Sequence, residues 1–181
     1  MNIPERSAQV FEKAKINPIP VRMKRINGSG YDSSRQEIIL AECHLARWPE
    51  SWPAIMAHEL AHHHIRNIKS FVDLFGLIIA GILASAPFVF AINPMTSILA
   101  IFLLITNIAV WAKIFGWGEE LICDMYARRW SDVNYQIEQF EICAKNYSRY
   151  SALSQIRSTH PPILLRLYFA RRAKAKMLAC R

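Results

Sequence analysis

Two histidines and a glutamate fall within the five-residue segment His58-Glu59-Leu60-Ala61-His62. On a helix, residues four apart differ by about 40° and one turn of rise, so His58 and His62 point from one face and can bind one zinc ion. Glu59 lies at the edge of that face, where it can take a proton from a zinc-bound water rather than bind the metal. The segment therefore predicts a hydrolytic zinc site. A chance match in a histidine-rich stretch is the alternative.

The other histidines carry less information. His63 and His64 are rotated by about 140° and 240° from His58 on the same helix, so we expect them at the surface or in packing contacts. An isolated histidine such as His44 or His160 is usually a polar group with a satisfied partner.

A catalytic zinc site needs a third protein ligand and an open position for water. The best candidate is the acidic segment that begins at Glu119 and Glu120 and ends at Asp124. On a helix Glu120 and Asp124 share a face, so one carboxylate can bind the metal while the other accepts a hydrogen bond from the second nitrogen of a histidine ligand. The alternative is a solvated acidic helix start, which we take as the explanation of Glu119.

Turn and capping residues indicate which elements position these side chains. Ser51 is a candidate N-cap and Pro53 suits the first turn, so a helix should run from Trp52 through the late sixties. Gly116 and Gly118 are expected to loosen the chain before the acidic segment. The other expected elements are a short helix, a strand and a loop over residues 1–35, a strand over 37–42, and helices over 119–130, over 131–155 and after 158–162.

An apolar block separates the two parts of the predicted site. Residues 75–92 and 97–111 contain no Lys, Arg, Asp or Glu, and Asn93-Pro94-Met95-Thr96 between them is a turn signal. Each stretch is close to the roughly 20 residues that cross a bilayer, so the pair predicts a transmembrane helical hairpin. A hairpin buried in a soluble domain is the alternative.

The charge distribution supports a membrane partner over nucleic acid. The net charge is +3 over residues 1–70 and +6 over 113–181, so basic segments flank the apolar block on both sides. That pattern is typical of the cytoplasmic face of a membrane protein. The four cysteines are too scattered for a disulfide framework, and the first thirty residues lack the apolar core of a signal peptide. We therefore expect both termini in the cytoplasm.

Three separated motifs resemble the gluzincin membrane peptidases typified by the HtpX heat-shock protease and the CAAX prenyl protease. They are His58-Glu59-Leu60-Ala61-His62, Glu120-x-x-x-Asp124-x-x-Ala127, and Ser158-Thr159-His160-Pro161-Pro162 with Arg166. Their order is that of the family, and the apolar block lies between the two metal-binding motifs as in its membrane members. Two departures are Cys123, where the family has a smaller residue, and the lack of two membrane helices before the first motif.

The resemblance implies one zinc ion per chain, held by His58, His62 and Glu120, with Glu59 as the catalytic base. It places Asp124 behind the ligands, and His160 near the bound peptide, where it would help to hold the scissile carbonyl or the developing oxyanion. It also implies that the strand around residues 38–40 is an edge strand above the zinc helix, which an extended peptide could join through main-chain hydrogen bonds. An ordinary sheet strand is the alternative.

These expectations combine into an α+β fold, predominantly helical, of the gluzincin type. A small N-terminal sheet would pack on the zinc helix, residues 1–70 and 113–181 would form one discontinuous catalytic domain, and residues 71–112 would form the membrane hairpin. The expected function is a zinc metalloendopeptidase of the inner cell membrane, crossing it more than once with its catalytic domain in the cytoplasm. Its partners would be the bilayer and peptide or protein substrates, membrane proteins among them, and no nucleic acid.

Two other functions fit part of the sequence. The ImmA/IrrE family of regulatory metalloproteins has a similar zinc helix and a later glutamate, but typically carries Asn four residues after that glutamate and lacks both the hairpin and the His-Pro-Pro element. Asp124 and His160 favour the peptidase. A membrane interaction protein with a decayed site is the third reading, and the intact set of ligands and base argues against it.

Overall fold

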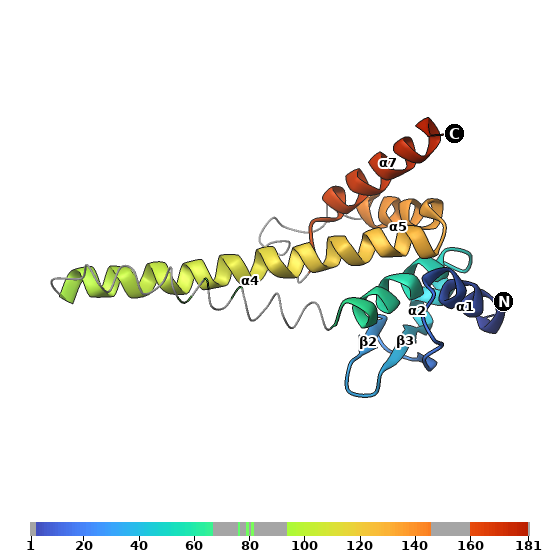
Figure 1. The fold of residues 1–181 in the computed structure, drawn as a ribbon, viewed down its shortest axis with the longest axis horizontal. Coiled ribbons are helices and arrows are strands. Elements are labelled where there is room, and N and C mark those ends of the chain that lie inside the picture. The colour runs from blue at the N-terminus through green and yellow to red at the C-terminus, as the bar shows by residue number, and fades with distance from the viewer. Residues whose placement is uncertain are drawn as a thin grey trace. The chain divides into compact units, whose positions relative to one another are not determined.

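The computed structural model describes residues 3–66, 76, 79, 81, 94–145 and 160–180 (Figure 1). This part of the chain is mostly helical with one three-stranded sheet, which confirms the predicted α+β class. Its strands are β1 (Val21–Lys24), β2 (Gly30–Asp32) and β3 (Glu37–Ala41). Its helices are α1 (Ile3–Ala14), α2 (Glu42–Arg47), a helix over residues 52–66 that we call the His58 helix, α4 (Pro94–Trp130), α5 (Val133–Lys145) and α7 (Ile163–Ala179).

Two compact units make up the chain. One consists of Met1–His64 together with Glu120–Arg181, and the other of Ile65–Glu119. The first unit contains the sheet, most of the His58 helix, the C-terminal part of α4, and helices α5 and α7. Every candidate site residue lies in this unit.

The strand predicted over residues 37–42 is present as β3, but it is not an edge strand. β3 pairs in parallel with β1, Val21 opposite Ile38, and antiparallel with β2, Tyr31 opposite Ile38. Ile38 and Leu40 are buried, as expected of a central strand. The predicted role of residues 38–40 as a free edge for a substrate peptide is therefore wrong, because both sides of β3 already have hydrogen-bonded neighbours.

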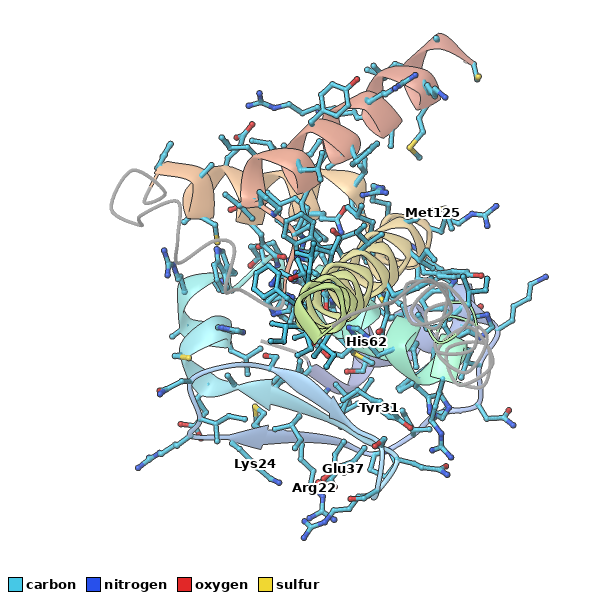
Figure 2. The ribbon with its side chains drawn as sticks, turned by 90° about the vertical axis from the view of Figure 1, so that its left-hand side faces the viewer. Arg22, Lys24, Tyr31, Glu37, His62 and Met125 are labelled. Carbon is cyan, nitrogen blue, oxygen red and sulfur yellow. The ribbon has the colours of Figure 1, made fainter. Side chains whose placement is uncertain are left out.

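The first residue of β3 carries a buried carboxylate. Glu37 is 2% exposed, and Arg22, Lys24 and Arg35 surround it with N···O distances of 2.9, 3.5 and 3.9 Å (Figure 2). A buried charge needs such partners because its hydration is lost. Glu37 thus ties β1 and the β2–β3 connection to the central strand.

The His58 helix, drawn in green in Figure 1, has a fully buried face. Trp52, Met56 and Leu60 are 0% exposed and four residues apart, so they form one stripe on the helix. The helix starts where the Ser51 carbonyl accepts the Ala54 N–H. The Ser51 hydroxyl is buried and has no hydrogen-bond partner within the described part of the chain, so the predicted side-chain cap is not formed.

Helices α5 and α7 pack against each other through a small apolar cluster. Phe140 from α5 contacts Leu167 and Ala170 from α7, and Ile163 packs partly buried against them. An ion pair at 2.7 Å between Arg171 and Glu141 adds to this contact at the surface.

The predicted hairpin is described only in part. Most of residues 75–92 lie outside the described residues, whereas residues 97–111 belong to α4. α4 continues through Gly116 and Gly118, so the predicted loosening there is wrong. A helix tolerates isolated glycines at a cost of about 1 kcal/mol each. Within the described residues, no helix is both long and apolar enough to cross a membrane.

The burial of the His58 helix predicts that its core side chains contribute strongly to stability. Met56→Ala should lower the free energy of unfolding by about 2–5 kcal/mol, because the lost side chain leaves a cavity. Met125→Ala is the matched control, since Met125 is 43% exposed on α4 and its loss should cost at most about 0.5 kcal/mol. Urea unfolding of both variants measures the difference, and equal losses would contradict the observed packing.

Candidate metal centre

Three side chains from two helices converge on one point. The Nε2 atoms of His58 and His62 lie 3.3 Å apart, and the Glu120 carboxylate oxygens lie 3.3 Å from His58 Nε2 and 3.5 Å from His62 Nε2. A tetrahedral zinc ion with bonds of about 2.05 Å requires a ligand-to-ligand spacing of about 3.3 Å. The distances to the two Glu120 oxygens and between the histidines are of this size, and the predicted set of His58, His62 and Glu120 forms a group that could hold a metal ion.

The two helices explain why these donors meet. His58 and His62 are one turn apart on the His58 helix, so their rings point the same way, with centroids 5.0 Å apart. Glu120 and Asp124 are one turn apart on α4, so both carboxylates face these histidines. His58 and Glu120 are 8% exposed, which separates the donors from bulk water.

Asp124 lies next to the first histidine. Its Oδ1 is 3.0 Å from His58 Nδ1, close enough for an ion pair, although the ring nitrogen makes no hydrogen bond within the described part of the chain. The predicted role of Asp124 behind the ligands of a bound metal stays a prediction.

Arg166 anchors Asp124 in turn. Its guanidinium donates two hydrogen bonds to the carboxylate, from Nε to Oδ2 at 2.7 Å and from Nη2 to Oδ1 at 2.6 Å. Gln136 Nε2 adds contacts of 3.2 Å to the Asp124 carbonyl and 3.3 Å to Oδ1. Asp124 is 0% exposed, and these donors compensate for the hydration that its charge has lost.

Sequence reasoning assigned no role to Arg166 or Gln136. The sequence did point to Arg166, because this residue belongs to the third motif of the family resemblance. Its contact with Asp124 could not be deduced from the positions of the two residues in the sequence. Gln136 had none, since a glutamine in the middle of a helix is usually at the surface.

The electrostatics of the site favour charged carboxylates. Burial alone would lower the pKa of His58, but contacts with Asp124 and Glu120 raise it to about 9. Burial opposes ionisation of Glu120, yet hydrogen bonds from His160, His58 and His62 bring the pKa of Glu120 well below its usual range. Burial also opposes ionisation of Asp124, but the positive charge of Arg166 outweighs this effect, so the pKa of Asp124 is lowered as well. A metal ion and a proton would therefore compete for the nitrogens of His58.

Glu59 and His160 both reach the edge of this centre. Glu59 follows the first ligand on the helix, is 9% exposed, and lines a cavity of about 340 Å³ together with His58 and His160. His160 was predicted to lie near the substrate, and its Nδ1 lies 2.7 Å from Glu120 Oε2. The structure thus brings His160 to the third donor itself, with 55% of its side chain exposed.

The remaining histidines make packing contacts, as predicted for His63 and His64. His63 Nδ1 lies 2.8 Å from the hydroxyl of Tyr31, which joins β2 to the His58 helix. The His64 ring lies edge-on to those of Tyr126 and Trp130. His44 Nδ1 is 3.0 Å from the Ser29 hydroxyl.

Comparison with known proteins identifies no relative: no family model, curated protein or solved structure matches the chain. The chemistry of the site therefore has to be argued from its own residues.

The contacts of Arg166 predict a large effect of its removal. Arg166→Met should cost about 3–5 kcal/mol of unfolding free energy, because it leaves the buried Asp124 charge without its main partner. Zinc affinity should fall by something like 10- to 100-fold, because His58 loses its orientation. Arg171→Met is the matched control on the same helix. Its exposed pair with Glu141 should be worth at most about 1 kcal/mol, with no effect on zinc.

Proposed function

We propose that the chain is a zinc metallopeptidase that cleaves peptide bonds with a zinc-activated water. The observation that carries the proposal is the spacing of 3.3–3.5 Å among donor atoms of His58, His62 and Glu120, with Glu59 next to His58 in the chain and lining the same cavity as His58. Three protein ligands leave the fourth tetrahedral position open for water, which distinguishes a catalytic zinc site from a structural one.

A zinc ion bound there would lower the pKa of its water to about 7 and polarise the substrate carbonyl. Glu59 would be the general base that takes a proton from the attacking water and gives it to the leaving amine. Asp124, 3.0 Å from His58 Nδ1, would leave Nε2 of His58 for the metal, and Arg166 holds Asp124 in place. His160 lies at the cavity, where its ring can approach the scissile carbonyl or the developing oxyanion.

We propose further that the chain is related to the HtpX-like and CAAX-prenyl-protease-like gluzincins. The order of the three motifs supports this relation, and so does the contact between Asp124 and Arg166, which joins the second motif to the third. An ImmA/IrrE-like regulatory metalloprotein is the second candidate. It would use the same donors, and Asp124, the apolar stretch 97–111 and His160 favour the peptidase over it.

Membrane attachment is a separate part of the proposal. Residues 75–92 and 97–111 contain no charged side chain, and Ile98, Phe102 and Ile105 on α4 are more than 60% exposed. Exposed apolar surface of this kind marks contacts with lipid or with another protein. We propose that this segment associates with the inner membrane and that the metal centre faces the cytoplasm.

Adjacent carboxylates on α4 give a sharp test of the proposed chemistry. Glu120→Gln should lose both bound zinc and peptide cleavage, because it removes a metal ligand. Glu59→Gln should retain about one zinc per chain and lose cleavage, because it removes only the base. Glu119→Gln should leave both nearly normal, since Glu119 is turned about 100° from Glu120 on the helix.

Zinc content by metal analysis and cleavage of a casein digest by mass spectrometry measure these outcomes for all three variants. If Glu119→Gln emptied the site and Glu120→Gln did not, the assignment of the third ligand would be refuted.

Cysteine labelling tests the membrane arrangement. If residues 93–96 lie across the membrane from the metal centre, a reagent confined to the cytoplasm should modify Cys in Gln36→Cys but not in Met95→Cys, in a background without the four native cysteines. Permeabilised cells, in which both positions should react, are the control. Modification of position 95 alone in intact membranes would overturn the topology.

A further inference from the structure

A cavity of about 340 Å³ shares the side chain of His58 with the candidate metal centre. Glu59 and His160 also line it. Its walls come from the connection before β2, from α2, from the start of the His58 helix, and from α5 and α7. Ligand pockets typically measure about 300–1,000 Å³, so this cavity has room for one side chain and the adjoining backbone, but not for a folded partner.

Much of the cavity lining is apolar. The apolar residues that line it include Trp48, Ala54, Ile55, Phe140 and Ile163. The Cys143 thiol also contributes, and burial raises the pKa of Cys143, so this group stays uncharged at neutral pH. Transfer of an apolar side chain from water to such a surface is favourable by about 1.5–3 kcal/mol.

Several polar groups of the lining already have partners within the protein. Ser29 Oγ contacts His44 Nδ1 at 3.0 Å and accepts the Ala41 N–H. Gln139 Nε2 donates to the Ser51 carbonyl, and Gln136 contacts Asp124. These groups shape the cavity rather than demand hydrogen bonds from a ligand.

The charges of the lining disfavour a charged ligand. The Arg166 guanidinium is bonded to Asp124 and lies 4.7 Å from the centroid of the Phe140 ring, so it is already neutralised. An acidic side chain would lose its hydration and would find the Arg166 guanidinium already paired with Asp124. A basic side chain would lose its hydration as well.

Ile55 lies on the same helix surface as the proposed general base. Ile55 is one helical turn before Glu59 and three residues before His58, so all three lie on adjoining parts of one helix surface. A side chain that occupies the cavity beside Ile55 would therefore lie close to Glu59, the proposed general base.

We propose that this cavity is a specificity pocket for one uncharged, medium-sized to large apolar side chain of the peptide substrate, and that Ile55 and Ile163 set its size. This proposal rests on the proposed peptidase function, because a specificity pocket requires a peptide substrate. Ile55 and Ile163 suit this role because both are only partly buried, on different helices, and neither is a candidate metal ligand or base.

Binding to the zinc-loaded full-length Glu59→Gln chain tests the pocket without requiring cleavage. The probes are blocked pentapeptides, acetyl-Gly-Gly-X-Gly-Gly-amide, with X as Leu, Phe, Asp, Lys or Gly, and titration calorimetry gives their Kd. The Leu and Phe peptides should bind at least about 10-fold more tightly than the Asp, Lys and Gly peptides. Equal binding of all five, or preference for a charged residue, would overturn the proposal.

Size variants in the same background test the two isoleucines. Ile163→Ala and Ile55→Ala should shift the preference from Leu toward Phe, and Ile163→Trp and Ile55→Trp should weaken Leu binding by about 10-fold or more. Leu164→Ala is the matched control, because Leu164 is 54% exposed beside Ile163 and does not line the cavity. A shift in preference is a result that a general loss of stability would not produce. Unchanged preference in folded, zinc-containing variants at both positions would refute the assignment.

The pocket and the peptidase function can be refuted independently of each other. Selective binding without cleavage by the native chain would leave the pocket in place and refute the peptidase. Cleavage of a casein digest without preference for apolar residues beside the cut would leave the peptidase in place and refute the pocket.

Discussion

The carboxylate of Asp124 is fully buried where four helices meet, and the arrangement of the metal centre depends on how its charge is compensated. Arg166 of α7 binds both oxygens, Gln136 of α5 contacts one of them, and His58 lies 3.0 Å away. An unpaired charge in this position would cost several kcal/mol. The fold therefore keeps these groups together, and His58, the first of the candidate metal donors, is one of them.

The same constraint connects the site to the rest of the domain. α7 packs on α5 through Phe140, Leu167 and Ala170, so Arg166 reaches Asp124 only when this apolar cluster is formed. On the other side, the buried stripe of Trp52, Met56 and Leu60 holds the His58 helix in register. The apolar packing and the charge pairs thus stabilise the same arrangement of side chains. In this arrangement the candidate metal donors need little movement to accept an ion.

The parts of the site that follow from helical periodicity could be predicted from the sequence. The pairs His58 with His62 and Glu120 with Asp124 are each four residues apart, so their common faces could be predicted before any tertiary contact was known. Their convergence between two distant helices could not be derived from spacing, and came from the resemblance to a family. The pairing of Arg166 and Gln136 with Asp124 depends on tertiary packing alone.

The errors in the fold prediction have the same origin. β3 has an apolar pattern that fits a central or an edge strand, and only the pairing of β1 and the three-residue β2 on either side decides between them. Gly116 and Gly118 weaken a helix by local propensity, but the helix continues through both. Short strands and long helices are where neighbouring structure overrides local preference.

The central claim is that one zinc ion binds to His58, His62 and Glu120. Anomalous diffraction from crystals of the purified chain, recorded on both sides of the zinc absorption edge, tests it most directly. The account predicts a single zinc peak about 2.0–2.2 Å from both Nε2 atoms and from a Glu120 oxygen, with Glu59 outside bonding distance. A zinc peak at other residues, or one that Glu59 binds in place of Glu120, would contradict it.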